Sequence, residues 1–412
     1  MVVDINICGL KIGDEHPVRL MGAINLSPES FFKASVADSD SILNMAHRMV
    51  DEGATIIDIG ARSTWPLAEP ITKNKELQRL LPALGILQDN VDAVISVDTM
   101  FSDIAEKSLK LGADIINDVS GFTADENMAD IVADHDCHAV VMASDKITGD
   151  PIGMNSVMES LDAIIKKARS RGIGNDQLIL DPAIGKWIAE KEPIYDLETI
   201  NQFDRLNIFE KPILAAISRK SFLGEVLGKP AEERLFGSLA ATAIVVSKGA
   251  HIIRTHDVAP TLDVIKVASA TRSRRPVVRD GDFEVSVLDI THPSDAVMAM
   301  RMVGATGTGC NVMKNKTVNR VVRIRNITTT EALIIKQEML SRGGDAALAR
   351  DAVSHETERT DVIVTGTLLQ MGRLISKLEG QARSLPLISG MIRKTLDLQM
   401  DVEYQYSEDI KI

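Results

Sequence analysis

Polar side chains follow almost every apolar run in the first two thirds of the sequence, at the point where each run ends. A single aspartate or asparagine in such a place could simply cap a helix or hold a turn. As a set they predict a binding site, because burying several carboxylates and a carboxamide around one opening is unfavourable unless a ligand or a neighbour satisfies them. The set comprises Asn25, Asp58, Arg62, Asp98, Asn117, Asp118, Asp181, the stretch 218–220, Arg254 and His256.

The residue types in this set indicate the chemistry of the ligand. Carboxylates and an amide without a His or Cys metal cluster suit a neutral heterocycle with several N–H groups, because aspartate accepts a bidentate pair of hydrogen bonds and asparagine both donates and accepts. Lys220, Arg254 and His256 add cations and N–H donors that suit a phosphate or diphosphate. The sequence therefore predicts a heterocyclic substrate that carries a diphosphate.

These residues require a scaffold that brings the ends of many strands together. Apolar runs rich in Val and Ile recur about every 20 to 40 residues, and each is followed by helical periodicity, which is typical of βα units. Eight such units favour an α/β fold of the (β/α)8 TIM-barrel type over an open sheet, with the functional groups at the C-terminal ends of the strands. The expected strands are 19–25, 55–60, 93–98, 114–118, 139–143, 178–181, 213–218 and 251–254.

Length and composition limit the class of protein. The chain has 412 residues, more than a barrel of roughly 250 needs, so a second domain is expected. Hydrophobic residues make up 45% and the net charge is −12, which indicates a folded globular chain and argues against nucleic acid as a partner. The sequence shows no signal peptide and no apolar stretch that could span a bilayer. We therefore expect a cytoplasmic protein that acts on small molecules and binds no membrane. A homodimer is also expected, although these features do not bear on it.

The domains are expected at 1–272 for the barrel and 283–412 for a smaller α/β domain, with a linker at 273–282. The linker prediction depends on the basic run around Pro276, which lacks apolar periodicity. Residues 304–309, GATGTG, lack the strand–loop–helix order of a dinucleotide-binding loop and are interpreted as a flexible turn. This domain shows no catalytic constellation, so covering the barrel opening, dimerisation and partner binding are all open. The three cysteines are expected to be buried and inert.

Seven segments resemble, in order and spacing, the motifs of the dihydropteroate synthases, a family of pterin-binding TIM barrels. The match extends over about residues 15–260. Seven ordered motifs on successive βα units are far more specific than a single glycine pattern. The segments are MGAINLSPESFF (21–32), GATIIDIGARST (53–64), ISVDT (95–99), GADIINDVSGF (112–122), LILDPAIGK (178–186), AISRKSFLG (216–224) and IIRTHDV (252–258).

The resemblance implies a transferase that joins 6-hydroxymethyl-7,8-dihydropterin diphosphate to an arylamine and releases diphosphate. It also implies that Asp98, Asn117 and Asp181 hold the pterin and that Lys220 lies against its ring. Asp98, Asp181 and Lys220 are therefore the candidate catalytic residues. Ser221 matches the hydroxyl beside the arylamine.

The same resemblance assigns the diphosphate and its metal. Arg254 and His256 match the residues that bind diphosphate, and Asn25 matches a residue that binds the diphosphate and Mg²⁺, the expected cofactor. A methylene carbon that leaves a diphosphate gains positive charge, which the electron-rich pterin can spread, while Mg²⁺ and cationic side chains stabilise the departing anion. No strong base is required, because an aniline nitrogen is neutral at pH 7.

Departures from the family pattern concern the second substrate. The family usually has GGESTRPG where this chain has GARSTWPL, so that Arg62 replaces an acidic residue, Trp65 an arginine and Leu67 a glycine; the motif DPGIGFGK is shortened to DPAIGKW. Arylamine recognition in the family depends on the first two loops, which places Arg62, Ser63 and Thr64 among the expected substrate-binding residues. Both p-aminobenzoate and the ribosylated, phosphorylated aminobenzene of methanopterin synthesis are open, the latter because Arg62 could meet its extra phosphate.

Two other functions compete with this interpretation. A pterin-dependent methyltransferase that acts on a corrinoid would keep the pterin-binding residues, but it has no use for a diphosphate clamp of Lys220, Arg254 and His256. A catalytically silent barrel that binds pterin, or that serves as a scaffold for a partner, is supported by the altered loop at 61–67.

Overall fold

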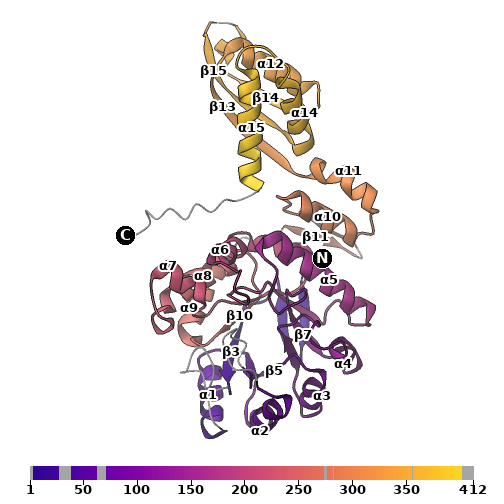
Figure 1. Ribbon diagram of the computed structural model, residues 1–412, viewed down its shortest axis with the longest axis vertical. Helices are drawn as coiled ribbons and strands as arrows, with labels where there is room; N and C mark the ends of the chain where they lie inside the picture. The colour runs from indigo at the N-terminus through magenta and orange to yellow at the C-terminus, as the bar shows by residue number, and fades with distance from the viewer. Residues whose placement is uncertain are drawn as a thin grey trace. The chain divides into compact units, whose positions relative to one another are not determined.

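Eight parallel strands form a closed barrel in the computed structural model, which describes residues 3–26, 39–62, 71–272, 276–281, 283–354 and 356–400. The strands are β3 (Arg19–Asn25), β4 (Ile56–Gly60), β5 (Val94–Asp98), β6 (Ile115–Asp118), β7 (His138–Met142), β8 (Leu178–Asp181), β9 (Leu214–Ala216) and β10 (Ile252–Thr255). They lie in the order β8-β7-β6-β5-β4-β3-β10-β9, and a parallel bridge between Leu180 and Ile213 joins the two ends. The expected (β/α)8 fold is confirmed (Figure 1).

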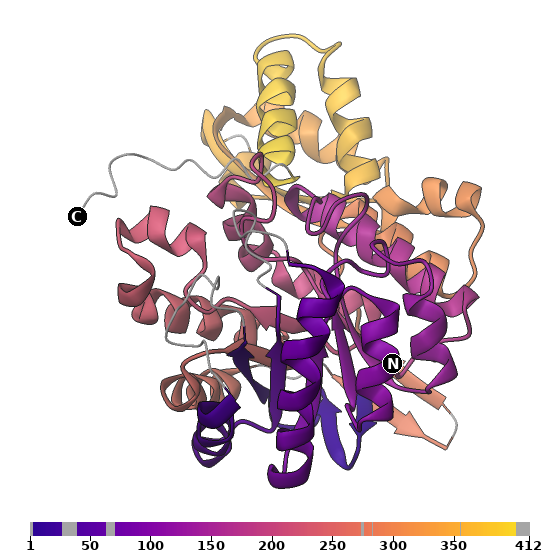
Figure 2. The same cartoon turned by 60° about the horizontal axis from the view of Figure 1, so that its bottom comes forward.

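Helices surround the strands and connect each one to the next (Figure 2). Each helix buries one face: in α2, Leu80, Leu84 and Leu87 follow a helical spacing and are fully buried. Gly53 and Gly249, which follow the first and eighth of these helices, have φ values of +110° and +120°, a left-handed conformation that turns the chain into the next strand. The helices are α1 (Ser39–Asp51), α2 (Lys73–Asn90), α3 (Ser102–Lys110), α4 (Met128–Asp134), α5 (Gly153–Ser170), α6 (Pro193–Asn201), α7 (Ser221–Leu227), α8 (Leu235–Ser247) and α9 (Val258–Thr271).

The inward-facing side chains change from apolar to polar along the strands. Each strand contributes one residue to a buried apolar layer near its N-terminal end, for example Ile56 of β4 and Val94 of β5. Because side chains alternate across a strand, the next inward positions lie two residues further on, and there the register places Asp58 beside Ser96. The barrel therefore has an apolar floor and a polar opening. The floor layer consists of Met21, Ile56, Val94, Ile115, Val140, Ile179, Leu214 and Ile252.

An antiparallel hairpin that the sequence analysis did not predict covers this floor. Its strands are β1 (Asp4–Ile7) and β2 (Leu10–Gly13), and its residues Ile5, Ile7 and Ile12 pack against the apolar layer. The turn contains Cys8, whose thiol donates to Asp114 Oδ1 at 3.1 Å, and this hydrogen bond together with burial raises the thiol pKa to about 11. Cys8 is exposed, so the prediction that it is buried is wrong, whereas Cys137 and Cys310 are buried.

The chain divides into two compact units, residues 1–287 and 288–412. The segment expected to be a linker carries strand β11 (Val277–Asp280), which pairs with β12 (Phe283–Ser286). Arg279 forms an ion pair with Glu284 across the hairpin at 2.9 Å and another with Glu15, next to the N-terminal hairpin, at 3.7 Å. The first unit thus includes both β11 and β12, whose side chains are mostly exposed.

The second unit packs helices against a three-stranded antiparallel sheet of order β13-β15-β14. The strands are β13 (Asn319–Thr328), β14 (Asp345–Leu348) and β15 (Arg359–Thr367); the helices are α10 (Pro293–Met302), α11 (Gly307–Thr317), α12 (Thr329–Leu340), α13 (Arg350–Val353), α14 (Leu368–Leu378) and α15 (Leu385–Met400). Thr328 with Glu331, and Thr367 with Gln370, form capping boxes that start α12 and α14. The GATGTG run, expected to be a flexible turn, is only partly a turn: Thr306 caps α11 by accepting from Gly309 N, and residues 307–309 form the first turn of that helix. None of the helices in the described ranges is both long and apolar enough to cross a membrane.

Candidate functional site

A fully buried carboxylate, Asp58, is the centre of the polar layer. The hydroxyl of Ser96 donates to its Oδ1 at 2.6 Å, and the amide of Asn117 donates to its two oxygens at 3.4 and 3.3 Å. Arg254 Nε donates to Oδ2 at 2.7 Å. Four strands, β4, β5, β6 and β10, thus meet on one carboxylate, which fixes where the amide and the guanidinium lie.

Arg254 also reaches the second carboxylate of this layer. Its Nη2 lies 3.3 Å from Asp98 Oδ2 at the end of β5. Burial, followed by the negative charge of Asp58, raises the pKa of Asp98 to about 8, although Arg254 opposes this shift. Burial thus favours the protonated form of Asp98, which can both donate and accept hydrogen bonds. Burial disfavours the charge on Arg254, but Asp58 and Asp98 raise its pKa, so it stays a cation.

Asp181 at the end of β8 lies on the same side of the barrel as Lys220. Ala183 N donates to Asp181 Oδ1 at 2.8 Å. Burial raises the pKa of Asp181, whereas the Ala183 amide and the charges of Lys220 and Arg254 lower it. Burial also lowers the pKa of Lys220 to about 8, an effect that Asp181 partly offsets. The structure thus brings Asn117, Arg254 and Asp98 together around Asp58, and it places Asp181 near enough to Lys220 and Arg254 for their charges to lower its pKa.

Lys220 lies between the backbone of Gly185 and the indole ring of Trp187. Its Nζ lies 4.9 Å from the ring centroid of Trp187, within the range of a cation–π contact. On another side it packs on Gly185, where an added Cβ would come within 3.1 Å of its Cδ and Nζ. The shortened DPAIGKW segment therefore contributes the surface on which Lys220 lies.

His256 lies where β10 and β3 end. Its Nδ1 is 3.1 Å from Ser218 Oγ, and its Nε2 is 3.4 Å from the Asn25 amide nitrogen. Burial and the nearby charge of Arg254 lower the pKa of His256 to about 3. The sequence analysis counted His256 with the cations and N–H donors. The structure makes it a neutral hydrogen-bonding group, because a buried imidazole beside a guanidinium does not hold a second charge.

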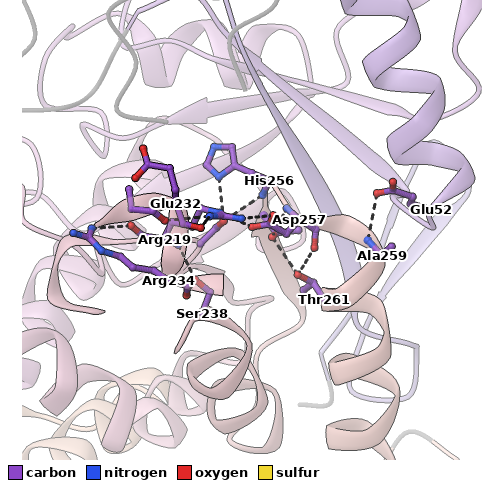
Figure 3. A network of polar contacts seen from close by, with 12 residues as sticks. Glu52, Arg219, Glu232, Arg234, Ser238, His256, Asp257, Ala259 and Thr261 are labelled. Carbon is purple, nitrogen blue, oxygen red and sulfur yellow. Dashed lines mark hydrogen bonds and ion pairs between the residues drawn. The ribbon is translucent and has the colours of Figure 1, made fainter. Parts of the chain in front are cut away.

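A network of polar contacts ties the loop after β9 to the loop after β10 (Figure 3). Arg219 donates to both carboxylate oxygens of Asp257, at 2.8 and 2.7 Å, and its Nη1 donates to the carbonyls of Ala231 and Glu232. The hydroxyl of Ser238 accepts from Arg219 N at 2.8 Å. Since Arg219 precedes Lys220 and Asp257 follows His256, this network fixes the loops that carry both residues.

The residues expected to bind the arylamine are only partly described. Ser221 is the first residue of α7 and half-buried. Arg62 donates to Glu76 Oε2 at 2.9 Å and to the carbonyl of Ile71 at 2.6 Å, and its guanidinium lies 5.1 Å from the Phe101 ring centroid. Glu76 is fully buried, so Arg62 serves as its counter-charge. Ser63 and Thr64, with Trp65 and Leu67, lie outside the described residues.

Within the described ranges, no group of three or more His, Cys, Asp or Glu side chains could hold a metal ion. Mg²⁺ often keeps several waters and takes its remaining ligands from one or two side chains and from substrate phosphates. A single amide oxygen of Asn25 fits that pattern, since the diphosphate would supply the other ligands.

The sequence analysis missed several residues that position the site. Asp58 was placed in the polar set but was given no role, although a charged residue inside the apolar run IIDIG was a signal for one. Ser96 shows the same signal within VISVD. Arg219 and Asp257 stood inside the quoted motifs, but their pairing across 38 positions has no local signature.

Comparison with known proteins decides the family. The model of the pterin binding enzyme family matches residues 21–256, which is more than half of the chain. The chain belongs to this family. The dihydropteroate synthase of Bacillus subtilis is 36% identical over 256 residues, 61% of this chain and 87% of the relative. The similarity between the two proteins identifies this chain as a transferase of the dihydropteroate synthase type.

Solved structures of the family agree with this. The dihydropteroate synthase of Coxiella burnetii, solved in complex with pteroic acid, is 34% identical with a TM-score of 0.60, covering 66% of this chain and 98% of that one. The enzyme of Xanthomonas albilineans, solved with 4-aminobenzoic acid, is 29% identical with a TM-score of 0.59, covering 66% and 99%. The family match ends at residue 256, so the second unit of this transferase lies beyond it.

Proposed function

We propose that the barrel condenses 6-hydroxymethyl-7,8-dihydropterin diphosphate with p-aminobenzoate and releases diphosphate. The observation that carries the proposal is the convergence of Asp98, Asn117 and Asp181, at the ends of β5, β6 and β8, with Arg254 and Lys220 beside them. The uncharged-ring binders Asp98, Asn117 and Asp181 differ in chemistry from the two cations. Carboxyl and amide groups suit the N–H and N edges of the pterin, and the cations suit its anionic tail.

In the proposed reaction the arylamine nitrogen bonds to the pterin methylene carbon as the bond from that carbon to the diphosphate oxygen breaks. The nitrogen then loses a proton to solvent. The chain's own contribution is to hold the two reactants in line and to stabilise the charge that moves to the leaving group. Arg254, tethered by Asp58 at 2.7 Å, and Lys220 supply positive charge for that anion.

Mg²⁺ is part of the proposal. Asn25, at the end of β3 beside His256, would provide a protein ligand, and when bound the ion would neutralise charge on the diphosphate. The test is to measure turnover as a function of added Mg²⁺. Wild type should require Mg²⁺, and Asn25→Ala should require a higher Mg²⁺ concentration than wild type.

The contacts of Arg62 favour p-aminobenzoate over the ribosylated, phosphorylated arylamine. If Arg62 left Glu76 to bind an additional phosphate, the buried Glu76 carboxylate would lose its counter-charge and keep the hydrogen bond from Thr99 Oγ1 at 2.8 Å. Leaving a buried charge unpaired is expensive. Arg62 is therefore proposed to serve as the counter-charge of Glu76 rather than to bind phosphate.

A direct assay separates the candidates. Isotope-labelled pterin diphosphate is incubated with each of the two arylamines, and diphosphate release and the coupled product are both measured. Product with p-aminobenzoate supports the proposal, and product only with the phosphorylated arylamine contradicts the proposed substrate. Pterin binding without diphosphate release under either condition would favour the methyltransferase or the silent barrel.

A further inference from the structure

Lys191 and Asp196 are buried charged residues that have no part in the reaction as proposed. Each is 2% exposed, although such side chains are rarely buried. Lys191 Nζ donates to the carbonyl of Ala183 at 2.5 Å and lies 3.8 Å from Asp196 Oδ1. The same Asp196 oxygen accepts from Gly185 N at 2.8 Å. Together they hold the backbone that follows β8.

That backbone is strained at Ala183. Its φ is +60°, the left-handed region that a residue with a Cβ disfavours. The family motif DPG has glycine at this position, so this chain keeps a conformation for which its own residue is poorly suited. Two polar contacts hold it there: Ala183 N donates to Asp181, and the Ala183 carbonyl accepts from Lys191.

The same segment supports two groups of the pterin site. The Ala183 amide orients the carboxylate of Asp181. Two residues further on, Gly185 offers its bare Cα to Lys220, and Trp187 places its ring under the Lys220 ammonium. A change of conformation at Ala183 would move both contacts together.

We propose that Lys191 and Asp196 are positioning residues for the pterin site, which hold residues 181–187 in the conformation that orients Asp181 and supports Lys220. The inference rests on the proposed function, because it takes Asp181 and Lys220 as pterin-binding groups. Neither Lys191 nor Asp196 touches substrate. They act through the backbone of Ala183 and Gly185.

The test measures the Kd of 6-hydroxymethyl-7,8-dihydropterin diphosphate by calorimetry, without arylamine. Lys191→Met removes the donor to Ala183 and is expected to weaken binding about tenfold, which corresponds to about 1.4 kcal/mol. Adding Ala183→Gly to this variant is expected to restore most of the loss, since glycine adopts the left-handed region without strain. Restoration would not occur if Lys191 acted only through its charge or through general stability.

Lys211 provides a matched control. It is also buried, at 5% exposed, and its Nζ also donates to a backbone carbonyl, that of Asn175 at 2.7 Å, before β9 begins. Lys211→Met is expected to lower stability and leave the Kd unchanged.

The outcomes separate this inference from the proposed function. If wild type does not bind the pterin diphosphate, the proposed function fails. If wild type binds and Lys191→Met binds equally well, or if Ala183→Gly restores nothing, the positioning role is overturned. Should Lys191→Met not fold, Asp196→Asn with and without Ala183→Gly takes its place, with the same weakening and restoration expected.

Discussion

Arg254 Nε donates to Asp58 Oδ2 at 2.7 Å inside the barrel, where Asp58 is fully buried. An ion pair in such a place depends on its other hydrogen bonds, because both charges have left water. Ser96 and Asn117 complete those of Asp58. The carboxylate thereby fixes a cation that is available to an anionic ligand.

Replacing Asp58 by Asn should therefore damage both stability and turnover. Breaking one side of a buried ion pair costs about 3 to 5 kcal/mol, so we expect a fall of that order in the free energy of unfolding. We also expect kcat/KM to fall more than tenfold, roughly 1.4 kcal/mol, because Arg254 loses its tether. Ser96→Ala, which removes one hydroxyl from the same carboxylate, should cost only about 1 kcal/mol. Equal effects of the two substitutions would contradict this account.

Pterin diphosphate affinity should fall as pH rises through about 8. The pKa of Lys220 is lowered to about 8, so Lys220 is charged below that pH and neutral above it. The pKa of Asp98 is raised to about 8, so over the same range Asp98 gains a negative charge that repels the diphosphate. Both changes in charge lower the affinity for pterin diphosphate as pH rises. Calorimetric Kd values between pH 7 and 9.5 test this.

The two contributions can be separated by substitution. Lys220→Arg keeps its charge throughout this range and should remove one part of the fall, and Asp98→Asn should remove the other. A double variant that loses affinity as steeply as wild type would exclude both groups as the cause. His256 should add no inflection near pH 6.5, since its pKa is lowered to about 3.

Arg219 and Asp257 should show strong energetic coupling. Their two parallel hydrogen bonds are largely buried, with side-chain exposures of 9% and 18%. A double-mutant cycle with Arg219→Met and Asp257→Asn is expected to give a coupling energy above about 1 kcal/mol. Arg219→Lys should recover little, because lysine cannot form the bidentate pair. Additive effects in urea unfolding would show that the loops are fixed by other contacts.

The first unit should be active without the second. It has its own closed barrel, and the family match lies within it. A chain that ends at Val287 keeps β11 and β12 paired, whereas one that ends near Asp280 would leave β11 without its partner. We expect kcat within about threefold of the full chain, roughly 0.6 kcal/mol. Loss of activity in a truncated chain that keeps its helical signal would assign a catalytic role to the second unit.

The sequence predicted the barrel and the strand ends well, because eight apolar runs of similar spacing leave few other folds. The bounds of β3 and β8 agree residue for residue. What it could not predict are contacts between loops distant in sequence, such as Arg219 with Asp257. The four-residue strand β14, DAAL, could not be predicted because its composition has little preference for strand. The start of α11 was interpreted as a flexible turn because the helix begins with glycines.

The hairpin under the barrel has a consequence for how reactants enter and products leave. Ile5, Ile7 and Ile12 pack over the apolar floor, so reactants are expected to reach the polar layer from the opposite end of the barrel. On the proposed reaction, spent diphosphate departs by the route along which the next arylamine arrives. The reactant that binds deeper is then expected to bind first, and the one that binds last is expected to leave first.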